Sequence, residues 1–336
     1  MKSWHLRMAI TSQCNYQCKY CSTLHPNDYI PIHEMRDILS AAYDSSIKRV
    51  HWTGGEPTCH PELLSAINLA AEMGYEEQVI STNGSSPQSY FEKLIANGID
   101  RFNISLDTLN PHHYYELTGR DCLQSVLKNI DMAVRAEKLV KINCVVMKKN
   151  LPEIPEIIRY FSTYNTERRD NIILRLIQFY PSNPNQLDKN GQNYWKEQYV
   201  HHSEILEMIG NHYEDHMYTR GDNPSFKYFR LKNHNLKVGI LSMFSWNYVC
   251  GGCLKLRITP LGQASVCLSD DKIYTLSGKT LSEKADIIQE AMARRLNYLD
   301  PIPRQHFRSQ LGMLRFGSDG NKVKISDFLE ILGDKG

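Results

Sequence analysis

The sequence predicts an α/β fold, a partial (β/α)6 TIM-like barrel with a smaller C-terminal domain. Its 336 residues are 41% hydrophobic and 23% charged, so the chain can bury a large core. Short β-rich runs alternate with amphipathic helical runs from residue 5 to about residue 180, which is the pattern of parallel strands joined by crossover helices. Six strand-like runs can be counted, fewer than the eight of a closed barrel.

The predicted elements follow one another regularly in this first part of the chain. The strand-like runs are HLRMAI, RVHWTG, EQVISTN, RFNISLD, VKINCVVM and NIILRLIQFY. The helical runs are HEMRDILSAAYDSS, PELLSAINLAAEMG, YFEKLIANG, CLQSVLKNIDMAVRAEK and PEIPEIIRYFSTY. Barrels of this kind carry their functional residues at the C-terminal ends of the strands, so we expect the site there.

The alternation stops at YPSNPNQLDKNGQN, where Pro, Asn and Gly accumulate as in a loop. We therefore expect a barrel core over residues 1–180, a connecting segment over 181–224, and a C-terminal domain with its tail over 225–336. Helices are expected at HSEILEMIGNHY and SEKADIIQEAMARR, with short strands in between.

Charge and cysteine content narrow the function. A net charge of +2 lacks the basic excess of a nucleic-acid-binding protein. No signal peptide and no membrane helix are evident, so we expect a cytoplasmic protein. In a reducing compartment nine cysteines are not expected to form disulfides, and six of them fall into two close groups of three that suggest metal binding.

The first group is CNYQCKYC, with Cys14, Cys18 and Cys21 spaced as C-x3-C-x2-C directly after the first predicted strand. Three thiolates on a short loop can ligate three irons of a cubane cluster and leave the fourth iron open. Zinc is the alternative, but a structural zinc site needs four ligands and usually C-x2-C pairs.

This motif, at this place in a partial barrel, resembles the radical S-adenosylmethionine (SAM) superfamily. The resemblance implies that the three cysteines hold a catalytic 4Fe-4S cluster. It also implies that Gly54, Gly55 and Glu56 form the GGEP loop, which meets the amino group of SAM. Glycines permit close backbone approach, and the carboxylate can accept from an ammonium or a backbone donor.

Further SAM contacts are expected by position along the predicted strands. Thr82 lies in STNG, and Ser105 lies in NISLD. Tyr20 resembles the residue whose backbone meets adenine. For Thr82 and Ser105 the alternative is a local hydrogen bond at a strand end.

The second group of cysteines is Cys250, Cys253 and Cys267, spaced as C-x2-C-x13-C. It is again one ligand short of a saturated site, so a second open cluster is predicted, with a zinc knuckle as the alternative. The segment resembles the GTP 3′,8-cyclase family of molybdenum-cofactor biosynthesis, and the likeness extends through LRMAITSQCNYQCKYC, TGGEP, STNG, RFNISLD, VKINCVVMKK and LRLIQF. The resemblance implies an auxiliary iron-sulfur cluster domain at the C-terminus.

Basic residues are carried over from that family as contacts to an anionic ligand. Lys149, Lys255 and Arg257 are expected to meet the substrate, and Arg175 the substrate or the SAM carboxylate. A solvated charge at a strand end is the alternative, least so for Arg175 because apolar residues flank it.

Three departures from the cyclase concern substrate binding. A basic stretch after GGEP is replaced by Thr58–Glu62, with sequence TCHPE, and a polar-Arg pair by Leu254-Lys255. The family's terminal Gly-Gly corresponds at best to Gly317-Ser318, which is not terminal. We therefore expect a relative of the cyclase that acts on a different nucleotide-type small molecule, with GTP a poor substrate.

The remaining cysteines have simpler interpretations. Cys59 and His60 lie beside the GGEP loop and either point into the cavity or begin the next helix. Cys122 and Cys144 fall in a predicted helix and strand as ordinary core residues.

The implied reaction is reductive cleavage of SAM to a 5′-deoxyadenosyl radical, which abstracts a substrate hydrogen so that a bond forms or rearranges. The second 4Fe-4S cluster would anchor the substrate or accept an electron, and a flavodoxin or ferredoxin would supply reducing electrons. Alternatives are modification of a ribosomally made peptide, true GTP 3′,8-cyclisation, an iron-sulfur electron carrier, and a zinc-binding module. No peptide-binding domain precedes the first strand, and a carrier needs clusters saturated by four thiolates each.

Overall fold

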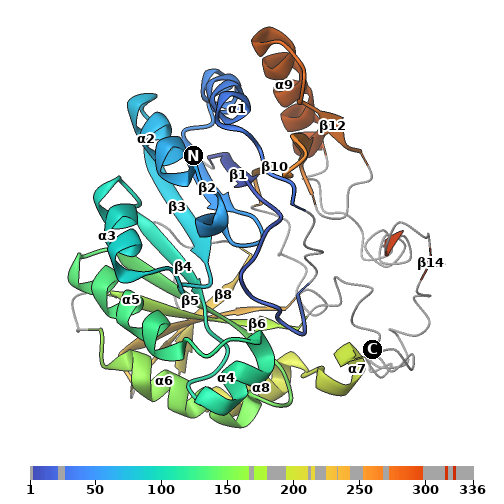
Figure 1. Cartoon of the computed structure of the whole chain (residues 1–336). Coiled ribbons are helices and arrows are strands. Elements are labelled where there is room, and N and C mark those ends of the chain that lie inside the picture. Colours follow the sequence, from blue (N-terminus) through green and yellow to red (C-terminus); the bar gives the residue numbers. More distant parts are fainter. Residues whose placement is uncertain are drawn as a thin grey trace.

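A computed structural model describes residues 3–21, 27–165, 170–179, 194–210, 213–215, 225–232, 234–242, 253–267, 272–297, 315–316 and 321–322. Its centre is a curved sheet with helices on the outer face (Figure 1). The predicted α/β class and the partial parallel barrel are confirmed.

Six parallel strands form the middle of the sheet in chain order, as predicted. Apolar side chains on one face of each strand lie under the helices, while polar side chains on the other face point inward, because successive residues of a strand alternate between faces. The six strands are β1 (His5–Ala9), β2 (Arg49–Thr53), β3 (Glu77–Thr82), β4 (Arg101–Ser105), β5 (Leu139–Val146) and β6 (Ile172–Gln178).

The crossover helices cover the outer face of the sheet. Their buried positions recur at the helical spacing, as at Val126, Ile130 and Ala133, so each helix has one apolar side. They are α1 (Ile32–Asp44), α2 (Leu63–Glu72), α3 (Gln88–Ala96), α4 (Pro111–Thr118), α5 (Leu123–Arg135) and α6 (Ile154–Ser162), with 3-10 turns η1 (Pro57–Cys59) and η2 (Leu151–Glu153).

Helix α4 is absent from the sequence prediction. Its start is set by the Asn110 side chain, which accepts from the backbone N–H groups of His112 and His113. Its end is set by Gly119 in the left-handed conformation, with φ of 70°. The helix is short and its polar residues dominate, so it carries little apolar periodicity for the sequence to reveal.

The C-terminal part of the chain extends both edges of the sheet. The order is β12-β11-β10-β1-β2-β3-β4-β5-β6-β9-β8-β7, and β10 and β9 run parallel to β1 and β6. The strands of residues 227–241 and those of residues 255–275, so far as the structure describes them, therefore lie on opposite edges of one sheet. The flanking strands are β7 (Tyr213–Asp215), β8 (Lys227–Leu231), β9 (Leu236–Leu241), β10 (Lys255–Ile258), β11 (Gln263–Ser265) and β12 (Tyr274–Thr275); β13 (Arg315–Phe316) and β14 (Asn321–Lys322) form a separate pair.

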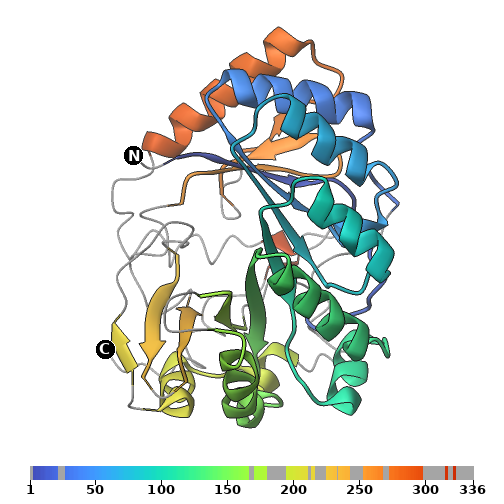
Figure 2. The same ribbon diagram turned by 90° about the vertical axis from the view of Figure 1, so that its left-hand side faces the viewer.

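Three more helices complete the described chain, namely α7 (Tyr194–Gln198), α8 (His202–Ile209) and α9 (Leu281–Asn297). Figure 2 shows α9, in orange, running alongside the blue helix α1. No helix in the described part of the chain is long and apolar enough to cross a membrane.

Candidate active site

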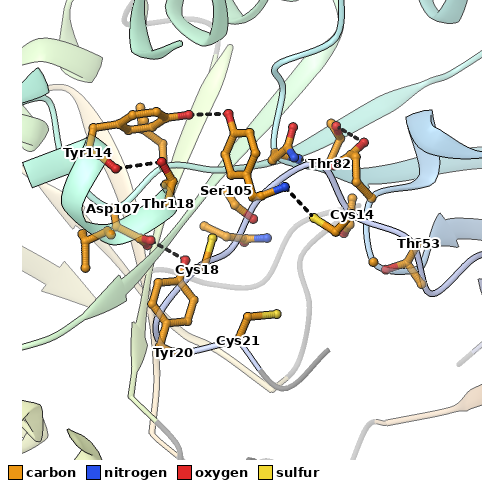
Figure 3. Close-up of a pocket in the computed structure, with 18 of the residues that line it drawn as sticks. Cys14, Cys18, Tyr20, Cys21, Thr53, Thr82, Ser105, Asp107, Tyr114 and Thr118 are labelled. Carbon is orange, nitrogen blue, oxygen red and sulfur yellow. Dashed lines mark hydrogen bonds between the residues drawn. The ribbon is translucent and has the colours of Figure 1, made fainter. Parts of the chain in front are cut away.

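A cavity of about 230 Å³ opens at the C-terminal ends of the barrel strands, where function was expected. Figure 3 shows the cysteines of the first group and the strand-end hydroxyls facing one another across it. The cavity is lined by cysteines, charged groups and strand-end polar residues, among them Arg7, Cys14, Cys18, Tyr20, Cys21, Gly55, Glu56, Thr82, Ser105, Asp107 and Asn143.

The cysteine loop is held in place by helix α4. The backbone N–H of Gln17 donates to the carbonyl of Thr118 at 3.0 Å, and that of Lys19 donates to the carbonyl of Leu117 at 3.1 Å. These carbonyls belong to the last turn of a helix, which has no internal donors for them. The helix that the sequence did not reveal thus positions the ligand loop.

The donor set fits a cluster with one open iron. Cys14, Cys18 and Cys21 reach the cavity, and neither a histidine nor a fourth cysteine is among its lining residues in the described chain. Burial raises the pKa of the Cys14 thiol to about 11 and raises the pKa of Cys18 further, so without a metal these thiols are protonated at neutral pH. A bound metal removes that penalty because it deprotonates its thiol ligands.

The glycines of the GGEP loop allow a close approach between two segments of the chain itself. A Cβ on Gly55 would lie 2.2 Å from the carbonyl oxygen of Gln13, and one on Gly54 would lie 2.4 Å from that of Thr11. Instead the Gly55 N–H donates to Thr11 and the Glu56 N–H to Gln13, both at 2.7 Å. The loop is thereby fastened to the start of the cysteine loop.

Glu56 is buried, with 1% of its surface exposed, and its carboxylate is used within the protein. It accepts from the N–H and hydroxyl of Thr58 at 3.1 and 2.7 Å, from the hydroxyl of Thr82 at 2.7 Å, and from the N–H of Asn83 at 2.6 Å. Burial raises its pKa, and the four hydrogen bonds oppose that rise. Glu56 therefore joins the end of β2 to the end of β3.

The remaining predicted SAM residues differ in what they offer. The Thr82 hydroxyl is committed to Glu56 and to the N–H of Gly84 at 3.0 Å. Ser105, in contrast, is exposed to the cavity, and its hydroxyl has no hydrogen bond to any residue that the structure describes. The Tyr20 hydroxyl donates to Asp107, whose pKa burial raises to about 6.

The inward faces of the strands are strongly basic. Arg7 on β1 lies directly opposite Arg257 on β10, and His5 lies opposite Lys255. Burial and the neighbouring Arg257 lower the pKa of Arg7 to about 10, while burial lowers that of Lys255 to about 8. No ion pair joins Arg7, Lys255 or Arg257 to a carboxylate in the described chain, and the buried Arg257 Nε has no hydrogen-bond partner there.

Other polar groups share this interior. Asn143 lines the cavity, so Lys141, two residues earlier on the same strand, faces the same way. His51 bonds Ser81 at 2.7 Å and Asn103 at 3.2 Å, and burial lowers its pKa well below the usual range. Arg7, His51 and Lys141 were not predicted as site residues, although each lies at an inward position of an alternating strand.

None of the four predicted basic residues, Lys149, Arg175, Lys255 and Arg257, lines the cavity. Arg175 is buried on β6, where its Nε donates to the Tyr228 hydroxyl at 3.2 Å. Lys149 is ion-paired with Glu116 at 2.5 Å on the outside. Their assignment to SAM and substrate stays a prediction.

Only part of the second cysteine group can be placed. Cys250 lies outside the described residues, as does Gly317-Ser318. Cys253 and Cys267 are half-buried, form no disulfide within the described residues, and lie on either side of the β10–β11 hairpin. Two cysteines at the two ends of one hairpin suit a shared metal group.

The other cysteines, and His60 beside Cys59, differ in their burial and in their contacts. Cys59 is half-buried in η1 and does not line the cavity. His60 is buried: its Nε2 donates to the Ile30 carbonyl and its Nδ1 accepts from the N–H of Glu62. Cys144 is a core residue, whereas Cys122 caps α5 at a half-buried position and bonds the Tyr16 hydroxyl at 2.9 Å.

Comparison with known families agrees with this geometry. Residues 8–161 match the Radical SAM superfamily, and residues 173–300 match the family described as Molybdenum Cofactor Synthesis C. Residues 8–161 therefore form a radical SAM domain, and the chain is an enzyme of that type, which uses SAM and 4Fe-4S chemistry. The resemblance inferred from the motifs is thereby confirmed.

Within that superfamily the chain resembles GTP 3′,8-cyclases. It is 27% identical to the GTP 3′,8-cyclase of Sulfurimonas denitrificans, over 98% of this chain and 97% of that one. It is 29% identical to a probable GTP 3′,8-cyclase of Sulfolobus acidocaldarius, over 90% and 94% of the two chains. These matches favour the cyclase alternative over a relative with a different substrate.

A solved structure supports the fold. The SAM-bound Streptococcus suis protein SuiB superposes with a TM-score of 0.64 at 16% identity, over 89% of this chain and 68% of that one. At such low identity the similarity concerns the barrel architecture alone.

Proposed function

We propose that the chain is a GTP 3′,8-cyclase, which joins the ribose of GTP to its purine. Relatives of that name match nearly the full length of the chain, and a nucleotide triphosphate is the most anionic of the substrates considered. The proposal replaces the expectation that GTP is a poor substrate.

The observation that carries the proposal is the cationic interior, where Arg7, Lys255 and Arg257 have no carboxylate partner in the part of the chain that the structure describes. Like charges directly opposite one another on paired strands are destabilising, yet Arg7 and Arg257 occupy such a pair. A buried cation without a partner is costly and is retained where a ligand supplies the opposite charge. Arg7, Lys255 and Arg257 together suit a polyphosphate.

The absence of a basic stretch after GGEP is weaker evidence against GTP as the substrate than the sequence alone suggested. His60 faces Ile30 and Glu62 rather than the cavity, and burial lowers its pKa, so that segment provides no cation. Three groups that the sequence analysis did not count, Arg7, Lys141 and the neutral His51, occupy the interior instead. These supply charge and hydrogen bonds from the barrel itself.

The chain's own residues prepare the site for the reaction. When bound, the reduced first cluster and SAM supply one-electron chemistry and a hydrogen-abstracting radical. Cys14, Cys18 and Cys21 hold that cluster at the cavity, and Ser105 offers a free hydroxyl there. The cationic interior orients the triphosphate, so that the reacting C–H bond is presented in one geometry and water is kept out. A flavodoxin or ferredoxin is proposed as the electron source.

The test is turnover of GTP by anaerobically reconstituted, reduced enzyme with SAM. We expect deoxyadenosine formation to be stimulated by GTP and a 3′,8-cyclised product to appear by mass spectrometry. GDP, ATP and a generic peptide serve as controls. Equal deoxyadenosine with and without GTP, and no new product, would reject GTP while leaving the radical SAM assignment intact.

A further inference from the structure

Helix α9 contacts the segment that carries a ligand of the second cluster. Arg295, in its last turn, is 3% exposed, and its Nε donates to the backbone carbonyl of Cys253 at 2.9 Å. A buried guanidinium is uncommon unless it is used, and a charge-assisted hydrogen bond to a carbonyl is among the stronger ones.

The same short segment is held from a second side. The carbonyl of Leu254 accepts from the N–H of His5 at 3.0 Å, and β10 begins at the next residue, paired with β1. The Leu254 side chain is buried in the core. The peptide after Cys253 is thus fixed between α9 and the edge of the barrel.

Helix α9 is itself fastened to the barrel by an ion cluster. Lys284 is fully buried, and its Nζ lies 3.0 Å from Glu34 and 3.2 Å from Asp37, both on α1. The Nζ also donates to the carbonyl of Lys279 at 2.7 Å. Helix α1, the first crossover helix of the barrel, therefore holds α9 in place, and α9 in turn contacts Cys253.

We infer that Arg295 is a positioning residue for the second cluster, with Lys284 as the anchor that keeps α9 in register. Arg295 fixes the direction of the Cys253 peptide and places a permanent positive charge at the backbone of a cluster ligand. The charge favours the reduced, more negative form of the cluster, so removing it makes the reduction potential of the second cluster more negative. This inference holds for either substrate, because it concerns the cluster and not GTP.

The test uses the full chain with Cys14, Cys18 and Cys21 replaced by Ala, so that the second cluster alone remains, with about four irons. Arg295→Met is expected to lower the iron content at least twofold. It is also expected to alter the electron paramagnetic resonance spectrum and shift the reduction potential of the remaining cluster to more negative values. Arg295→Lys, which keeps a donor and the charge, is expected to restore most of the iron.

Arg294→Met is the matched control, since it removes the same charge one position earlier on the helix, where the side chain points about 100° away. If Arg295→Met keeps wild-type iron, spectrum and potential, the inference is wrong. It is equally wrong if Arg294→Met and Arg295→Met lose iron to the same extent, because the effect would then be a general weakening of α9. If wild-type protein with both clusters does not convert GTP, the proposed function is wrong, but the inference about Arg295 is unaffected.

Discussion

The cavity beside the first cysteine loop and the basic interior of the barrel differ in how their polar groups are satisfied. In the cavity wall, Glu56 accepts four hydrogen bonds from Thr58, Thr82 and Asn83, so this carboxylate is satisfied without a ligand. In the interior, Arg257 faces Arg7, which also reaches the cavity, and neither has a carboxylate partner among the described residues. The Glu56 contacts are preorganised by the protein, whereas the arginine pair has no acidic partner within the described residues.

The difference has a consequence for stability. A change in the cavity wall removes contacts that hold strand ends together, so it should cost both folding stability and SAM binding. A change that removes an interior cation relieves repulsion, so it should cost substrate binding while leaving stability unchanged or higher. The two regions can therefore be told apart by measuring stability and binding together.

The largest effect is expected from replacing Cys14, Cys18 and Cys21 together with Ala. Deoxyadenosine formation should fall to background, and iron should fall from about eight to about four per chain, as two 4Fe-4S centres require. Cys59→Ala, close by but outside the cavity wall, is the control and should keep all its iron. Retention of full iron by the triple variant would show that the cluster is held elsewhere.

Removing an interior cation is next in size. Arg257→Met should raise the KM for GTP by about 10- to 100-fold, since a charge-assisted contact is worth about 1.5–3 kcal/mol. The dissociation constant for SAM and the iron content should stay unchanged, and the melting temperature should not fall. Lys272→Met removes an exposed cation paired with Glu290 and is the control. A lower melting temperature with unchanged KM would show that Arg257 stabilises the fold and does not bind the substrate.

In the cavity wall, Gly55→Ala should destabilise the protein by about 1–3 kcal/mol, the range for forced overpacking. The added Cβ would lie 2.2 Å from the Gln13 carbonyl oxygen, so the two loops must separate. SAM binding should weaken at the same time, measured by equilibrium dialysis. Gly278→Ala, where a Cβ meets nothing within 4 Å, should leave SAM binding intact.

A smaller effect is expected at Ser105, whose hydroxyl is free in the cavity. Ser105→Ala should weaken SAM binding by about 2- to 10-fold, since one neutral hydrogen bond contributes about 0.5–1.5 kcal/mol. The melting temperature should stay within about one degree, because no internal hydrogen bond is lost. Undiminished SAM affinity would remove Ser105 from the SAM contacts.

The smallest effect concerns pH. Burial lowers the pKa of His5 to about 4, below its unfolded value of 6.5, so the unfolded chain takes up a proton first as pH falls. Stability linked to His5 is therefore complete above pH 6.5 and is lost progressively between 6.5 and 4. His5→Asn should show a shallower decline of melting temperature over that window than wild type. Parallel curves would show that His5 does not contribute.

Sequence reasoning was strongest where local pattern decides structure. The six parallel strands follow from alternating runs, and the spacing of Cys14, Cys18 and Cys21 predicts a cluster site, which agrees with their place around one cavity. Helix α4 was missed because caps at Asn110 and Gly119, rather than apolar periodicity, define it. The short runs of β9 and β10 carried no sign that they would join opposite edges of the sheet.

The amino-acid sequence by itself determined the barrel, the place of the first cysteine group at the strand ends, and the likeness to radical SAM proteins. Only the tertiary structure decided what the motif residues contact. The GGEP glycines approach the chain's own backbone, and the Glu56 carboxylate accepts hydrogen bonds from neighbouring residues of the protein. It also showed that Arg7 faces Arg257, residues that are 250 positions apart in the chain. Periodicity is a local property that a sequence displays, whereas the register of distant strands depends on how the whole sheet closes.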